Sequence, residues 1–71
     1  MDNKYHFDVS MACQGCANSI DRVLNRLDSN SKVNIDLEKQ TVDVVTGADY
    51  DSVYNTIAKT GKKINQGNVV T

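Results

Sequence analysis

The sequence predicts an α+β domain in which four antiparallel strands form one sheet and two helices cover one face of it. Two observations predict this fold. Short segments with apolar residues at every second position alternate with longer segments whose apolar residues recur every three or four positions. Their order is strand, helix, strand, strand, helix, strand, in a chain of 71 residues that has room for one compact domain. This order is typical of the ferredoxin-like βαββαβ sandwich.

The first strand and the first helix flank a short polar loop. Tyr5, Phe7 and Val9 alternate with polar residues, which predicts a half-buried strand over 5–9. Residues 10–16, SMACQGC, are expected to form a loop, and a helix is predicted from about residue 16 to residue 27. Its apolar stripe consists of Ala17, Ile20, Val23, Leu24 and Leu27. The turn-forming residues 28–31 end this helix.

A hairpin is predicted next. Val33, Ile35 and Leu37 alternate with polar residues, which indicates a strand over 32–37. Residues 38–40 are short enough to be the hairpin connection to a third strand over 41–45. In that strand, Val42 and Val44 are expected to face inward.

A second helix and a last strand complete the chain. Asp49 can cap the helix. The residues expected on its buried face are Tyr50, Val53, Tyr54 and Ile57. Gly61 stands where a left-handed helix terminator belongs, and a weaker strand follows over 63–69 with Ile64 pointing inward. This topology places the loop after the first strand beside Lys62.

Composition excludes several classes of function. The net charge is −1, whereas a nucleic-acid-binding domain usually carries a basic surface. The sequence has no run of about 20 apolar residues that could cross a bilayer. Residues 1–4 lack the apolar stretch of a signal peptide. We therefore expect a soluble, cytoplasmic protein without membrane insertion.

The two cysteines of the chain, Cys13 and Cys16, are expected to bind a metal ion. A disulfide between them would close a very small loop and stabilise the fold little. Thiolates are soft donors that prefer Cu(I), Zn(II) and similar ions. Cys16 should lie in the first helical turn, where free amide groups stabilise a negative charge and lower the thiol pKa.

The number of ligands favours Cu(I). A closed structural zinc site needs four ligands, and the chain offers two thiols and a single histidine, His6. His6 is expected on the outer face of the first strand, away from the loop. Cu(I) accepts two thiolates and leaves a position for a ligand from another protein. A carrier needs such a position, so a carrier and not an enzyme is expected.

Two alternatives stay open. A thiol-disulfide oxidoreductase would use the same cysteine pair, but such enzymes place a cis-proline beside it, and this chain has no proline. Alternatively, the carried ion could be another soft metal such as Zn(II) or Cd(II).

The segment Met11–Cys16, MACQGC, resembles the M-x-C-x-x-C signature of heavy-metal-associated domains. Residues 60–62, TGK, and residues 36–40, DLEKQ, resemble the corresponding segments of eukaryotic cytosolic copper chaperones, and the resemblance spans about residues 5–67. It implies that residues 1–71 are a single heavy-metal-associated domain. It also implies that the protein delivers Cu(I) to the metal-binding domains of a copper-transporting P-type ATPase.

The chain departs from some members of this family. Ala12 stands where many members carry Thr or Ser, which affects one local hydrogen bond. Lys62 stands where the repeats of the ATPases themselves often carry Phe, and this difference favours a free chaperone. Periplasmic mercury carriers share the cysteine loop but begin with a signal peptide.

Other residues receive supporting roles. The ammonium of Lys62 is expected to offset the negative charge of a Cu(I)-dithiolate. Met11 is expected to support the loop from below, as a core residue and not a ligand. Basic residues that could dock an acidic partner are Arg22, Arg26, Lys59, Lys62 and Lys63. The protein is expected to be a monomer, although two such loops could share one ion in a metal-bridged dimer.

Overall fold

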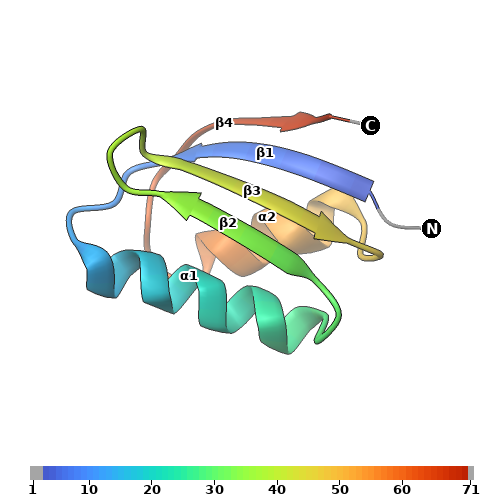
Figure 1. Cartoon of the computed structure of the whole chain (residues 1–71). Coiled ribbons are helices and arrows are strands. Elements are labelled where there is room, and N and C mark those ends of the chain that lie inside the picture. The colour runs from blue at the N-terminus through green and yellow to red at the C-terminus, as the bar shows by residue number, and fades with distance from the viewer. Residues whose placement is uncertain (1–2, 71) are drawn as a thin grey trace.

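The computed structural model describes residues 3–70, and its element order matches the predicted one. The elements are β1 Asn3–Val9, α1 Gln14–Leu27, β2 Lys32–Asp36, β3 Thr41–Thr46, α2 Tyr50–Ala58 and β4 Ile64–Val69. All neighbouring strands pair antiparallel in the order β2-β3-β1-β4. Figure 1 shows α1 and α2 on the same face of this sheet. The predicted ferredoxin-like βαββαβ sandwich is confirmed.

The core lies between the sheet and the two helices. Alternate residues of β1 and β3 face the helices because side chains of a strand point to opposite faces in turn. The buried apolar residues are Tyr5, Phe7, Val9, Met11, Ala17, Ile20, Leu24, Val42, Val44, Val53 and Ile57. Thr46 is buried as well, and its hydroxyl donates a hydrogen bond to the Asp28 carboxylate at 2.7 Å, which satisfies this polar group.

Two predicted core residues are on the surface, and these predictions are wrong. Leu27 is 39% exposed because it is the last residue of α1 and follows the buried residues Ala17, Ile20 and Leu24 of this helix. Tyr54 is 38% exposed, although its ring lies 6.3 Å from that of Phe7. Tyr50 is half-buried and stacks on Phe7 with ring centroids 5.5 Å apart. The spacing of apolar residues predicts which side of a helix faces the core, but it does not predict how many residues on that side are buried.

The ends of the helices differ from the prediction in detail. α1 begins at Gln14, two residues before the predicted start. Asp49 occupies the N-cap position of α2 but makes no side-chain capping hydrogen bond; its carboxylate accepts a hydrogen bond from the Ser52 hydroxyl instead. Gly61 has φ +84°, which confirms the predicted left-handed residue after α2. Within the described residues, neither helix is long and apolar enough to span a membrane.

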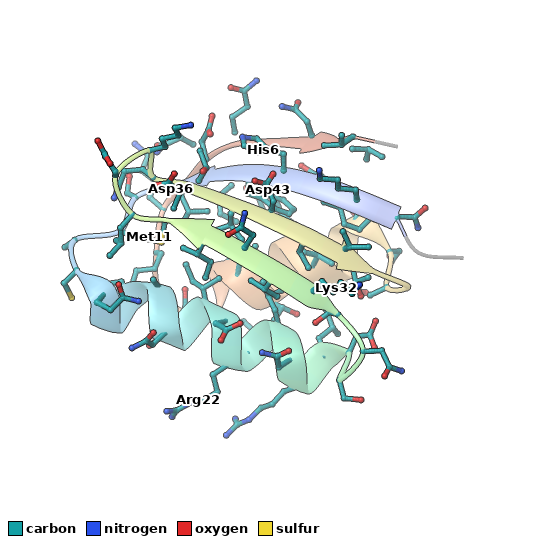
Figure 2. The ribbon with its side chains drawn as sticks, viewed as in Figure 1. His6, Met11, Arg22, Lys32, Asp36 and Asp43 are labelled. Carbon is teal, nitrogen blue, oxygen red and sulfur yellow. The ribbon has the colours of Figure 1, made fainter. Side chains whose placement is uncertain are left out.

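His6 lies on the outer face of the sheet, as predicted. Its Nδ1 is 2.6 Å from the Asp43 carboxylate, and its Nε2 is 3.3 Å from that of Asp8. The hydrogen bond with Asp43, with a smaller contribution from Asp8, raises the pKa of His6 above its ordinary value against the opposing effect of burial. Figure 2 shows His6 and Asp43 together on the sheet face opposite the helices.

Gly67 on β4 gives a test of how closely this fold is packed. A Cβ atom at this position would meet the hydroxyl of Tyr50 and would lie 2.8 Å from Cδ1 of Phe7. Gly67→Ala is therefore expected to lower the free energy of unfolding by about 1–3 kcal/mol, because a buried aromatic ring must move. Urea denaturation measures the change. The control is Asn68→Ala on the exposed neighbouring position, with an expected change below about 0.5 kcal/mol. Equal stabilities of the two variants would contradict this packing.

Candidate metal centre

The cysteine loop, defined here as residues 10–16, connects the end of β1 to the first turn of α1. Cys13 is the N-cap residue of α1 and has an extended backbone, with φ −160° and ψ 174°. Its carbonyl oxygen accepts hydrogen bonds from the N–H groups of Cys16 at 3.0 Å and Ala17 at 3.4 Å. Cys16 therefore lies in the first helical turn, as the sequence predicts.

The two sulfur atoms are close enough to bind one ion. Both thiols are free, Cys13 is exposed, Cys16 is half-buried, and their Sγ atoms are 3.8 Å apart. Metal–thiolate bonds are about 2.3 Å long, so two of them span up to about 4.6 Å. A separation of 3.8 Å thus allows a shared ion that lies off the line joining the sulfurs. Such an ion is open on the side away from the two thiolates.

The surroundings of Cys16 favour its thiolate form. Its pKa is lowered to about 7, first by a hydrogen bond from the backbone N–H of Ala12 and next by one from the side chain of Lys62. Smaller contributions come from Cys13, and burial acts in the opposite direction. The thiolate is the form that binds metals. At neutral pH, part of the Cys16 population is therefore already in the form that binds a soft ion.

Lys62 is far from the cysteine loop in the sequence but lies at the same end of the sheet. It follows Gly61 in the turn after α2, and its backbone N–H donates to the Thr60 hydroxyl at 3.4 Å. The Thr60 hydroxyl in turn donates to the carbonyl of Ile57 at 2.6 Å, which fixes the turn to α2. The side chain of Lys62 lies near enough to Cys16 to lower its thiol pKa, in agreement with the predicted proximity. Its effect on a bound ion stays a prediction.

Met11 and Gln40 support the loop. The side chain of Met11 is buried, as predicted for a core residue under the loop. The sequence analysis places Gln40 only in a hairpin connection, yet its side-chain oxygen accepts a hydrogen bond from the N–H of Met11. A turn position is the only signal that the sequence offers, and it does not reveal which segment the side chain contacts.

The described residues offer few further ligands. Within residues 3–70, no three His, Cys, Asp or Glu side chains lie close enough together to hold one metal ion. An open groove of about 180 Å³ lies between α1 and β2, and neither cysteine lines it. The thiols are thus displayed on a loop and not enclosed in a pocket.

The predicted basic docking residues lie at different distances from the thiols. Arg22 and Arg26 are exposed on α1, and Figure 2 shows Arg22 pointing away from the sheet. With a rise of about 1.5 Å per residue, they lie roughly 9 Å and 15 Å along the helix from Cys16. Lys59 and Lys63 are exposed near the end of α2, on either side of the half-buried Lys62.

Comparison with known proteins identifies relatives over nearly the whole chain. The model of a family described as heavy-metal-associated domain matches residues 6–64. The "Metal homeostasis factor atx1" of Schizosaccharomyces pombe is 52% identical over 67 residues, which cover 94% of this chain and 97% of that protein. The human "Copper transport protein ATOX1" is 39% identical over 62 residues, which cover 87% of this chain and 90% of that protein.

Solved structures share the fold. The copper chaperone Atx1 of Synechocystis PCC6803 superposes with a TM-score of 0.80, over 84% of this chain and 97% of that chain. Its sequence identity is 21%, so this likeness concerns the fold alone.

The lowered pKa of Cys16 leads to a pH-dependent prediction. In the metal-free reduced protein, alkylation of Cys16 by iodoacetamide should rise with pH with a midpoint of about 7, because only the thiolate reacts. Lys62→Met removes one of the groups that lower the pKa, so its midpoint should move to higher pH. Mass spectrometry of quenched samples measures both rates. Lys32→Met is the matched control, since Figure 2 shows Lys32 at the opposite end of the sheet. A midpoint that Lys62→Met leaves unchanged would contradict this contact.

Proposed function

The chain belongs to the heavy-metal-associated domain family, and we propose that it is a copper chaperone that holds one Cu(I) ion between Cys13 and Cys16. We further propose that it passes the ion by ligand exchange to the metal-binding domains of a copper-transporting P-type ATPase. One observation carries the proposal: two free thiols lie 3.8 Å apart on an accessible loop. As a carrier and not an enzyme, the protein transforms no substrate.

The number of available ligands supports Cu(I) as the cargo. Two thiolates satisfy the soft Cu(I) ion well enough to hold it, whereas a closed zinc site takes four ligands. Within residues 3–70, no cluster of three His, Cys, Asp or Glu side chains supplies a more complete site. The relatives, which include a human copper transport protein 39% identical to this chain, support the same ion.

The exposed loop suits a transfer by ligand exchange. A thiolate of the partner bonds to the copper ion on its open side, and one Cu–S bond of the chaperone then breaks. The released thiolate takes up the proton that the entering thiol has lost, and copper remains Cu(I) throughout. Free copper is never released, because the ion keeps at least two sulfur ligands at each stage.

Charged residues assist in two ways. The Cu(I)-dithiolate carries a net charge of −1, and the ammonium of Lys62 beside Cys16 offsets it. The basic residues Arg22, Arg26, Lys59, Lys62 and Lys63 attract an acidic partner to the loop. The protein acts in the cytoplasm as a monomer, with residues 1–71 as a single domain, and a metal-bridged dimer can form when no partner is present.

A thiol-disulfide oxidoreductase is the second candidate. The thiol pKa of about 7 at Cys16 also suits thiol-disulfide exchange, since a good attacking thiol has a pKa near the ambient pH. The two candidates predict different stoichiometries: a carrier retains one equivalent of Cu(I), whereas an oxidoreductase turns over a disulfide substrate many times. A carrier of Zn(II) or Cd(II) would prefer those ions in direct competition.

The proposed function leads to a prediction about the retention of Cu(I). Reduced protein should retain one equivalent of Cu(I) against a thiol competitor, and should prefer it over Zn(II) and Cd(II). The Cys13→Ala, Cys16→Ala double variant should lose this retention. Lys62→Met should weaken retention about fivefold, because it removes the ammonium that offsets the negative charge of the Cu(I)-dithiolate. Mass spectrometry of the intact protein during titration measures the stoichiometry and any bridged dimer.

The outcomes separate the hypotheses. Lys32→Met removes the same charge far from the loop and should retain Cu(I) as the parent does. Tight Cu(I) binding by the double variant would refute the assignment of the ligands. Rapid turnover of a disulfide substrate without copper retention would favour the oxidoreductase.

The proposed function also leads to a prediction about the docking of a partner. The Arg22→Glu, Arg26→Glu double variant should transfer Cu(I) to an acidic ATPase metal-binding domain about tenfold more slowly at low salt, because charge steering is reversed. At about 0.5 M NaCl the difference should largely vanish, since the Debye length is then only a few ångströms. Stopped-flow transfer kinetics measure both rates. The Cu(I) affinity of the double variant should equal that of the parent. A difference in transfer rate that persists at high salt would contradict a steering role of Arg22 and Arg26.

A further inference from the structure

The turn between β2 and β3 contacts the segment that leaves β1. In Figure 1 this turn stands beside the start of the cysteine loop. The N–H of Val9 donates to the backbone carbonyl of Gln40 at 3.0 Å, and the N–H of Met11 donates to the side-chain oxygen of Gln40 at 2.5 Å. The side-chain nitrogen of Gln40 donates to the carbonyl of Leu37 at 2.7 Å. Gln40 thus supplies two acceptors, its backbone oxygen and its side-chain oxygen. Its side chain is in turn fixed by the hydrogen bond to Leu37 within the turn.

The side chain of Gln40 continues the sheet where the backbone can no longer do so. The register between β1 and β3 ends at the pair Asp8 and Thr41. Gln40 has φ 58°, a left-handed conformation that turns the chain away from β1. Its side-chain amide takes the place of the next strand residue as the acceptor for Met11. On the other side, the N–H of Ser10 donates to the carbonyl of Lys63 at 2.9 Å.

The restraint on Met11 bears on the cysteine pair. Met11 lies two residues before Cys13, which is the N-cap residue of α1 and whose Sγ lies 3.8 Å from that of Cys16. The peptide unit between Ser10 and Met11 is held through the Met11 N–H, and the buried side chain of Met11 fixes the same residue against the core. The path of the backbone from Met11 to Cys13 therefore starts from a fixed residue.

We propose that Gln40 is a positioning residue of the metal centre. Its side-chain amide fixes the backbone of Met11, two residues before Cys13, and so prearranges the two thiolates for one Cu(I) ion. Residues that orient metal ligands from behind affect metal affinity without touching the ion. This inference rests on the proposed copper-carrier function.

The backbone conformation of Gln40 supports a role beyond turn formation. At φ 58° a glycine or an asparagine is favoured, since a larger side chain is strained there. The two side-chain hydrogen bonds of Gln40 to Met11 and Leu37 offset this strain. A turn alone would be served better by glycine.

Two variants of Gln40 test the proposal. Gln40→Met removes the amide but keeps the length of the side chain, and Gln40→Gly removes the side chain and relieves the backbone strain. Both should weaken Cu(I) retention about fivefold in competition with a chelator, the effect of one lost hydrogen bond. In the metal-free state of both variants, the Met11 amide should exchange with solvent about tenfold faster in NMR measurements. Gln66→Met on β4 is the matched control and should leave both readouts unchanged.

Urea denaturation separates positioning from a merely structural role. Gln40→Gly should unfold at a higher urea concentration than Gln40→Met, because glycine suits the left-handed turn, yet both should lose the same fraction of Cu(I) affinity. Copper affinity that follows the unfolding midpoint across the variants would overturn the proposal, and so would unchanged retention or unchanged Met11 exchange. A parent chain that retains no Cu(I) would instead remove the proposed function, and this inference with it.

Discussion

The central position of β1 in the sheet is the constraint on which the proposed metal centre depends. Because β1 lies between β3 and β4, the amides that follow its last residue find acceptors on both sides. Val9 and Met11 donate toward Gln40, and Ser10 donates toward Lys63. The first residues of the cysteine loop are therefore hydrogen-bonded on both sides, as strand residues are, although β1 itself ends at Val9. An edge strand would leave one of these two sides without partners.

This anchoring reconciles two opposing demands on a carrier. The thiols must be exposed so that a partner can take the ion, and they must also be held close together so that the ion is not lost. Burial of Met11 and the N-cap position of Cys13 fix the backbone below the thiols, while the sulfurs themselves stay accessible. A site with four protein ligands would hold its ion more firmly but would leave no position for exchange.

The same geometry sets the electrostatics of the site. The Ala12 N–H, the Lys62 side chain and Cys13 lower the pKa of the Cys16 thiol. Lys62 reaches this sulfur because the turn after α2 lies at the same end of the sheet as the end of β1. Two segments far apart in the sequence, the cysteine loop and the turn after α2, thus stabilise one negative charge. In the proposed function, Arg22 and Arg26 on α1 would add a longer-range attraction to an acidic partner without changing the thiols.

The sequence by itself determined the order of elements, the inward faces of β1 and β3, the left-handed residue Gly61 and the placement of Cys16 in a first helical turn. These features follow from local periodicity, turn chemistry and helix geometry, which neighbouring residues specify. It could not fix the width of a buried helix face, so Leu27 and Tyr54 were assigned to the core although they are exposed. Only the tertiary structure decided that the Gln40 amide supports Met11 and that the Ala12 N–H meets Cys16. Such contacts depend on the direction of single side chains and peptide units across strands, and a pattern of apolar and polar residues does not encode that direction.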